Sequence, residues 1–192
     1  MSGLAPQAFW YLRHGQTDWN AKDLAQGNLE VPLNATGIAQ AEEAAVLLRG
    51  RGIATLICSP LGRARTTAEI VSRAIGLPIL CEEALHEASF GVNEAKPIFD
   101  AWFADWIAGR ATPEGAESFA ALRERAVQAV NRALTHPAPV LVVAHGSLFR
   151  ALRAEMGLDP SVRLANATPQ LCEPPPRPGT PWTLTPATQV AG

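Results

Sequence analysis

Two apolar runs in this chain end in the same dipeptide, His-Gly. The first is AFWYLRHG, which closes at His14-Gly15, and the second is VLVVAHG, which closes at His145-Gly146. A short run of apolar, β-branched and aromatic residues that stops at a glycine is typical of a buried parallel strand. Ligands in open α/β sheets bind just beyond the carboxyl ends of such strands. The pattern therefore predicts two imidazoles at the end of the sheet where binding and chemistry take place.

The rest of the chain alternates strand patterns with helix patterns. ATLICSP and PILCE are two further strand candidates, and helical spacing of apolar residues is found in LNATGIAQAEEAAVLLRGRG, LGRARTTAEIVSRAIG, residues 117–135 and SLFRALRAEMG. Strands that alternate with helices of this length indicate βαβ units. We therefore expect a three-layer α/β/α sandwich around a mostly parallel sheet, in a single domain over residues 1–192.

Two segments depart from this alternation. Phe99, Trp102, Phe103 and Trp106 form an aromatic stripe at helical spacing, which is more often core than a hydrophobic wall over a substrate. The Pro-rich C-terminal tail, residues 173–192, excludes a helix, but PQLCE and PWTLT are candidates for an edge hairpin.

Composition narrows the class of protein. The 47% hydrophobic and 18% charged residues exclude a disordered chain, and the net charge of -2 provides no basic field for nucleic acid. No signal peptide and no apolar run of roughly 18 residues is present, so we expect a cytoplasmic protein without membrane contact, either a monomer or a homodimer. Cys58, Cys81 and Cys172 are odd in number and widely separated, which predicts three reduced packing residues.

The residues around the two His-Gly turns suit phosphate chemistry. Arg13 precedes the first histidine, and its planar guanidinium matches phosphate oxygens. A neutral imidazole can attack phosphorus and carry the phosphoryl group covalently, so His14 is the candidate nucleophile. Arg63 follows the ATLICSP run and opens a helix whose amides would add positive potential. His145 would donate to a phosphate oxygen, preferably as the imidazolium, although by itself it would be interpreted as a satisfied structural histidine.

The sequence contains no recognised metal-ligand spacing among its His, Cys, Asp and Glu residues. We therefore expect neither a metal nor another cofactor. Without a metal, the charge of a transferring phosphoryl group would have to be met by cations and hydrogen-bond donors of the chain.

Five blocks, in order, resemble the histidine phosphatase superfamily, which includes the cofactor-dependent phosphoglycerate mutases. YLRHGQTDWN resembles the RHG signature of that family. LAQGNLEVPLNATGIAQA is similar to QGxxDxPLTxxGxxQA, SPLGRARTTAEI to SPLxRAxQTA, LHEASFG to LxExxFG, and AHGSLFRAL to the second His-Gly block. RHG alone would be a weak signal, but five blocks in order are a strong one.

The resemblance implies a role for each matching residue. Glu87 would be the acid-base glutamate, which gives a proton to the leaving alkoxide and later takes one from water, with Glu94 as a distant rival. An alternative role for Asn20 is to bond the loop backbone. The implied phosphate contacts are Arg13, Asn20, Gln26, the amide of Gly27, Arg63, His145 and Gly146.

Several positions depart from the family pattern. Glu30 stands where the family usually has Asp, Asn93 and Ala95 replace the Trp and Gly of FGxWEG, and Ser147 replaces a frequent Gly. None of these changes removes a group needed for chemistry. The altered pocket floor beside Glu87 means that no relative's substrate transfers directly to this chain.

These observations favour a phosphomonoester hydrolase that acts on a small phosphorylated metabolite through a phosphohistidine. Mutases of the family carry a longer, basic insertion after the glutamate block, whereas this chain has only Lys96 and Arg110 as cations between residues 88 and 110. That charge is small for holding a bisphosphate, and the aromatic stripe suits a neutral leaving group. The alternatives are a cofactor-dependent phosphoglycerate mutase and a non-catalytic protein that binds phosphorylated ligands. A non-catalytic member would be expected to lack one of Arg13, His14, Arg63, Glu87 and His145.

Overall fold

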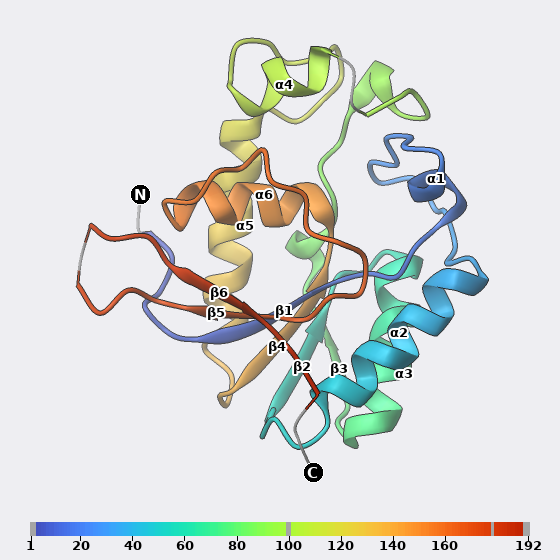
Figure 1. The fold of residues 1–192 in the computed structure, drawn as a ribbon. Coiled ribbons are helices and arrows are strands. Elements are labelled where there is room, and N and C mark those ends of the chain that lie inside the picture. Colours follow the sequence, from blue (N-terminus) through green and yellow to red (C-terminus); the bar gives the residue numbers. More distant parts are fainter. Residues whose placement is uncertain (1–2, 99–100, 178, 190–192) are drawn as a thin grey trace.

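A computed structural model describes residues 3–98, 101–177 and 179–189, and its centre is one six-stranded sheet (Figure 1). The strand order is β3-β2-β4-β1-β5-β6. The β1–β4, β2–β4 and β2–β3 pairs are parallel, whereas β1–β5 and β5–β6 are antiparallel. The mostly parallel sheet is thereby confirmed. The strands are β1 Phe9–Arg13, β2 Thr55–Cys58, β3 Ile79–Cys81, β4 Val140–Ala144, β5 Gln170–Glu173 and β6 Thr183–Pro186.

Helices cover both faces of the sheet, as expected for three layers (Figure 1). Alternate residues of β1 point to opposite sides: Tyr11 packs in one buried cluster with α5 and α6, and Leu12 packs in another with α2 and α3. The helices are α1 Asp18–Ala21, α2 Ala35–Leu48, α3 Gly62–Ile75, α4 Ala101–Ile107, α5 Phe119–Ala133 and α6 Gly146–Glu155, with short 3-10 turns η1 Glu83–Leu85 and η2 Gly91–Asn93.

Side-chain N-caps begin α2 and α5, and a glycine ends α3. Asn34 accepts a hydrogen bond from the Gly37 amide at 2.8 Å and is the N-cap of α2. Ser118 accepts from the Ala121 amide at the start of α5. Helix α3 ends at Gly76, whose φ of 72° lies in the left-handed region that glycine tolerates. The four helical patterns of the sequence are confirmed.

The C-terminal tail contributes to the sheet. Strands β5 and β6 pair antiparallel, from Glu173 opposite Thr183 to Gln170 opposite Pro186, so the expected edge hairpin is confirmed. The proline-rich stretch lies between the two strands and includes Pro174, Pro175 and Pro181. Residue 178 lies outside the described residues.

Most of the aromatic stripe is core. Trp106 is fully buried and stacks on Phe103 with ring centroids 5.5 Å apart, and the partly buried Trp102 donates from Nε1 to the Pro97 carbonyl. Phe99 lies outside the described residues. In the described ranges, no helix is long and apolar enough to span a membrane.

The cysteine prediction is wrong at one position. Cys58 and Cys172 are buried, but Cys81 is exposed, and all three are free thiols. The reason is the place of β3 at the edge of the sheet, where its end has no neighbouring strand on one side.

The central strand pair sets the position of the two histidines. Strands β1 and β4 are parallel neighbours, and Arg13 lies opposite Ala144 in their register. The next residues, His14 and His145, therefore leave the sheet side by side at its carboxyl edge. The His14 amide also donates to the Ala144 carbonyl at 3.0 Å, which extends the ladder up to the turn.

Candidate active site

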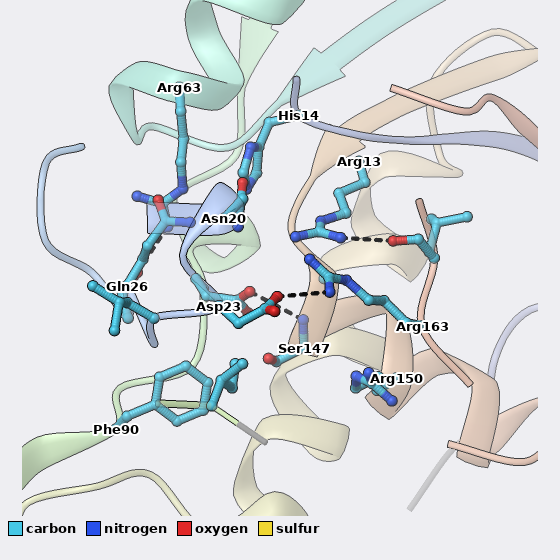
Figure 2. A pocket seen from close by; sticks show the side chains of 16 residues that line it. Arg13, His14, Asn20, Asp23, Gln26, Arg63, Phe90, Ser147, Arg150 and Arg163 are labelled. Carbon is cyan, nitrogen blue, oxygen red and sulfur yellow. Dashed lines mark hydrogen bonds and ion pairs between the residues drawn. The ribbon is translucent and has the colours of Figure 1, made fainter. Parts of the chain in front are cut away.

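A pocket opens at the carboxyl edge of the sheet, and it contains most of the residues singled out in the sequence (Figure 2). His14 lines this pocket, while His145 lies fully buried next to it, with ring centroids 5.3 Å apart. The sequence-predicted residues that line the pocket are Arg13, His14, Asn20, Gln26, Gly27, Arg63, Glu87 and Gly146.

His14 is held in one tautomer. Its Nδ1 lies 2.7 Å from the Gly15 carbonyl oxygen, and a carbonyl can only accept, so Nδ1 carries the proton and Nε2 keeps the lone pair. Gly15 itself has no room for a side chain, because a Cβ there would lie 2.2 Å from the Gly37 carbonyl oxygen. Burial, then Arg63 and Arg13, lower the pKa of His14 well below its usual value. The ring is therefore neutral and nucleophilic at neutral pH.

His145 has one nitrogen engaged and one without a partner. Its Nε2 lies 2.7 Å from Ser59 Oγ, whereas Nδ1 is buried with no hydrogen-bond partner in the described part of the chain. The Tyr11 hydroxyl donates to the His145 carbonyl at 2.8 Å and accepts from its amide at 3.1 Å, which fixes the backbone at the end of β4.

The charge expected for His145 is not what the site favours. Burial, Arg63 and His14 lower the pKa of His145 well below its usual value, so the ring is a neutral imidazole rather than the expected imidazolium. A neutral ring can still donate from Nδ1 if Nε2 accepts the Ser59 hydroxyl proton. Ser59 Oγ can provide that proton, since it accepts from the Leu61 amide through a lone pair.

Arg13 and Arg63 are both buried and partly engaged with the backbone. Arg63 donates from Nη2 to the Gly27 carbonyl at 2.7 Å and from Nη1 to the Leu29 carbonyl at 2.8 Å, and Arg13 donates from Nη1 to the Leu164 carbonyl at 2.7 Å. The Nε of each arginine is buried without a partner among residues 3–98, 101–177 and 179–189. Burial lowers the pKa of Arg13 to about 10, which leaves it charged at neutral pH. The two Nε–H groups and His145 Nδ1 are the unsatisfied polar atoms that an anion would need.

Glu87 is positioned by the first turn of α6. Its Oε1 accepts from the Leu148 and Ala88 amides at 3.1 and 2.9 Å, and its Oε2 accepts from the Ser147 amide at 3.0 Å. Negative charge is favoured at a helix N-terminus, so these amides orient the carboxylate towards the pocket. Oε2 accepts only one of these hydrogen bonds and keeps a lone pair that can hold a proton.

Arg125 supports the backbone around Glu87, a role that was not predicted from the sequence. Arg125 on α5 donates from Nη1 to the Ala84 and His86 carbonyls, both at 2.8 Å, and from Nη2 to the Glu87 carbonyl at 3.3 Å. It also pairs with Glu117 at 2.6 Å. The sequence signal for this role was absent, because Arg125 lies on an ordinary amphipathic helix and is 38 to 41 residues along the chain from the three carbonyls to which it donates.

The start of α3 differs from the expectation. Its first amide, on Gly62, donates to Glu30 Oε2 at 3.1 Å, so a carboxylate of the chain already occupies this helix N-terminus. Only the Arg63 side chain extends from α3 to the pocket. Glu30, which stands where the family usually has Asp, therefore caps the N-terminus of α3.

Asn20, Gln26 and Gly27 each line the pocket in a different way. Asn20 Oδ1 accepts from the Thr17 amide and from Asn166 Nδ2. Asn20 therefore bonds the loop backbone, which was its alternative role, and it also lines the pocket. Gln26 Oε1 is buried without a partner within the described residues. Gly27 has a φ of 55°, and its carbonyl receives Arg63.

Glu94, the less favoured candidate for the acid-base residue, lies behind Gly27. A Cβ on Gly27 would lie 2.1 Å from Glu94 Oε1, and the same oxygen accepts from the Phe90 amide at 3.3 Å. Glu94 does not line the pocket.

The mouth of the pocket contains charged residues that the sequence analysis missed. Arg150 from α6 and Arg163 from the following loop both line it, and Arg163 pairs with Asp23 at 3.0 Å (Figure 2). By contrast, Lys96 is exposed and Arg110 pairs with Asp105, and neither lines the pocket. The cations between residues 88 and 110 therefore do not represent the charge of the pocket, because those at its mouth come from elsewhere in the chain.

A signal for Arg150 was present in the sequence. It lies four residues after Gly146, and residues four apart lie on the same face of a helix. A helix that begins at the pocket therefore brings this side chain to the same side. Arg163 lies in a loop and has no comparable signal.

The described residues contain no group of three or more His, Cys, Asp or Glu side chains that could hold a metal ion.

Comparison with known proteins identifies the family. The family model of the histidine phosphatase superfamily, branch 1, matches residues 9–169. The chain belongs to the histidine phosphatase superfamily. The resemblance seen in the five sequence blocks is thereby confirmed.

Relatives in this superfamily are named for more than one activity. The chain is 37% identical over 161 residues to a protein of Yersinia enterocolitica named a probable phosphoglycerate mutase, GpmB, with 78% of this chain and 74% of that one covered. It is 36% identical over 165 residues to an uncharacterized phosphatase, PhoE, of Bacillus subtilis, with 81% and 82% covered.

Solved structures with the same fold include two phosphatases. The mycobacterial glucosyl-3-phosphoglycerate phosphatase, solved with VO3, has a TM-score of 0.80 at 27% identity and covers 94% of this chain and 98% of its own. A putative alpha-ribazole-5'-P phosphatase of Escherichia coli has a TM-score of 0.78 at 27% identity, with 96% and 97% covered. These comparisons agree on the superfamily and the fold.

Proposed function

We propose that this protein is a phosphomonoester hydrolase that works through a phosphohistidine at His14. The observation that supports this most is that Arg13 and Arg63, which line the same pocket as His14, each have a buried Nε–H without a partner among the described residues. A neutral nucleophile among fixed donors suits phosphoryl transfer, in which positioning and charge stabilisation supply most of the rate. The natural substrate would be a small phosphorylated metabolite.

In the first step, the His14 Nε2 lone pair forms a bond to phosphorus while the ester P–O bond breaks. The leaving alkoxide takes a proton from Glu87, which enters this step as the acid with the proton on Oε2. The Nδ1–H of His14 stays bonded to the Gly15 carbonyl and stabilises the positive charge that develops on the ring. The Nε–H groups of Arg13 and Arg63, and Nδ1–H of His145, would donate to the equatorial oxygens.

In the second step, water attacks phosphorus on the face that the alcohol has left. Glu87, now the carboxylate, takes a proton from this water, the N–P bond breaks and inorganic phosphate leaves. The enzyme returns to neutral His14 and protonated Glu87. One carboxyl group therefore serves both half-reactions, as the acid in the first and the base in the second.

The chain's own groups provide every proton and charge in this scheme, so the proposal includes activity without a metal. The test is hydrolysis of a panel of phosphomonoesters with and without EDTA. We expect phosphate release to persist in EDTA. Loss of release that a divalent ion restores would overturn the proposed mechanism.

Phosphoglycerate mutase activity is the second candidate. It is favoured by the names of several curated relatives and by Arg150 and Arg163 at the pocket mouth, which could retain an anionic product. The ion pair of Arg163 and Asp23 is about half exposed, however, so water has access to the mouth and hydrolysis should dominate. Assaying both reactions on one preparation distinguishes them. Efficient conversion of 3-phosphoglycerate to 2-phosphoglycerate that depends on 2,3-bisphosphoglycerate would identify a mutase instead.

A further inference from the structure

Arginines gather on one side of the pocket, outside the residues assigned to phosphoryl transfer. Figure 2 shows Arg163 and Arg150 on the same side as Arg13, while Arg63 and Gln26 lie on the other side. Arg150 comes from α6 and Arg163 from the loop that joins α6 to β5. The steps proposed above use neither side chain.

Arg150 is held firmly in place. It is only 6% exposed, and its Nη1 donates to the Pro160 carbonyl at 2.8 Å and to the Ser161 carbonyl. Its guanidinium carbon lies 5.3 Å from the centroid of the Phe103 ring, a cation–π arrangement. Within the described residues, Nε and Nη2 of Arg150 make no hydrogen bond. A guanidinium anchored by one nitrogen presents its other donors in a fixed geometry.

Arg150 lies close enough to Arg13 and Arg163 for the three guanidinium charges to repel one another. Burial and then Arg163 lower the pKa of Arg150 to about 10, and the pKa of Arg13 is lowered to about 10 by burial and then by Arg163. Glu87 and Asp159 attract Arg150 and offset part of this repulsion. Both also accept hydrogen bonds from other groups, Glu87 from helix amides and Asp159 from the Ser161 amide and hydroxyl. Asp23 is paired with Arg163. Repulsion among three guanidinium groups favours the entry of a further anion.

Apolar side chains lie in the same pocket as these arginines and the phosphoryl site. Phe90, Ile98 and Leu164 line it together with Leu24. A short hydrocarbon chain could pass along these side chains, with an anion at each end.

We propose that Arg150 and Arg163 form a second anion-binding subsite, so that the preferred phosphomonoesters carry a carboxylate or a second phosphate on the alcohol portion. This inference rests on the proposed function for the position of the first phosphate, beside His14. Asp23 competes with the incoming anion for Arg163 and gives up this ion pair when the ligand binds. The subsite would therefore decide which esters are accepted, while the inner residues carry out the transfer.

The experiment compares ligands that differ only in the second group. Inhibition constants against para-nitrophenyl phosphate hydrolysis are measured for glycerol 3-phosphate, for 3-phosphoglycerate, which has a carboxylate in place of the terminal alcohol, and for glycerol with phosphates at both ends. We expect 3-phosphoglycerate or the bisphosphate to bind roughly 10 to 100 times more tightly than glycerol 3-phosphate, the usual worth of a charge-assisted hydrogen bond. The tighter of the two identifies the second group.

Variants test which residues cause the preference for a second anionic group. Arg150→Gln and Arg163→Gln should each reduce the ratio of these constants by roughly tenfold or more. Asp23→Asn should raise the affinity for the anionic ligand severalfold, a gain that misfolding cannot produce. Arg153→Gln is the matched control: it removes the same charge from α6 at a side chain that does not line the pocket, and should leave the ratio unchanged.

The outcomes separate this inference from the proposed function. Equal affinity for the three ligands, or a ratio that survives both Arg150→Gln and Arg163→Gln, would overturn the subsite. Absence of para-nitrophenyl phosphate hydrolysis would count against the proposed function alone, and calorimetric titration of the same three ligands would then measure the preference directly.

Discussion

The inner end of the pocket and its mouth are built in different ways. At the inner end, His14, His145, Arg63 and Glu87 are at most 7% exposed, and each is tied to the backbone or to another side chain. At the mouth, Arg150 is a buried residue of α6, but the side chains of Asp23 and Arg163 are 52% and 40% exposed and come from loops.

The inner end is suited to the group that all substrates share, and the mouth to the group that differs among them. Fixed, buried groups suit a phosphoryl centre that is the same in every ester, because preorganised donors need no rearrangement during the reaction. Half-exposed charges on loops can exchange partners and therefore suit recognition of the variable alcohol portion. Substitutions at the inner end should affect all substrates, whereas substitutions at the mouth should change the preference among them.

Replacement of His14 should have the largest effect. His14→Ala removes the nucleophile and should lower turnover by roughly 10⁴-fold or more for every substrate. Phosphate release in steady state is the measurement. His136→Ala is the control, since His136 is an exposed histidine beyond α5. Substantial turnover by His14→Ala would remove His14 from this role.

The next largest effect is expected at Glu87. Glu87→Gln should lower turnover by roughly 10² to 10⁴, the usual worth of general acid-base catalysis. The loss should shrink for para-nitrophenyl phosphate, whose leaving group needs no proton. Glu30→Gln is the matched control, because Glu30 also caps a helix N-terminus but does not line the pocket. An equal loss on alkyl and aryl substrates would indicate that Glu87 has only a structural role.

A smaller effect is expected at Ser59, which acts through His145. Ser59→Ala removes the hydroxyl that donates to Nε2, and turnover at neutral pH should fall by roughly tenfold, as for a lost catalytic hydrogen bond. Without the Ser59 hydroxyl, the neutral ring of His145 can carry its proton on either nitrogen, and only the imidazolium always has a proton on Nδ1. The variant should therefore recover activity as the pH falls. A pH–rate profile parallel to that of the wild type would show that Ser59 does not set the tautomer.

Stability should also depend on the inner histidines, and the sign follows from their lowered pKa values. Between the lowered folded-state pKa and the ordinary value near 6.5, the unfolded chain binds protons that the folded protein does not, so the free energy of unfolding falls as pH decreases below about 6.5. Each histidine contributes at most about 1.4 kcal/mol per pH unit within that window. Denaturant unfolding from pH 7.5 to 5.5 measures this slope. His14→Gln should reduce it, and an unchanged slope would mean that His14 is not buried as a neutral ring.

The sequence predicted the inner end well because it depends on local patterns. Arg13 is the last residue of a strand that an apolar run defines, His14 and His145 each follow such a strand, and parallel neighbours end at the same edge of a sheet. The fold follows from the same runs and from helices with clear caps. The position of Glu87, by contrast, was found through the family resemblance and not through a pattern of its own.

The sequence failed where contacts join distant segments. Arg150 and Arg163 come to the mouth because α6 and its following loop return past Arg13, and Arg125 supports Glu87 from another helix. The neutral His145 was missed for a related reason: its pKa depends on burial and on Arg63, and neither can be measured in the sequence. Such placements arise from tertiary packing, which single-sequence periodicity does not encode.

The most direct test of the account is to trap the phosphorylated enzyme. Glu87→Gln, in which attack by water lacks its base, is mixed rapidly with para-nitrophenyl phosphate, quenched and digested, and the modified peptide is located by mass spectrometry. We expect an acid-labile phosphoryl group on His14, absent when His14→Gln is added to the same variant. Turnover by the wild type together with a phosphoryl group on another residue, or with none at all, would contradict it.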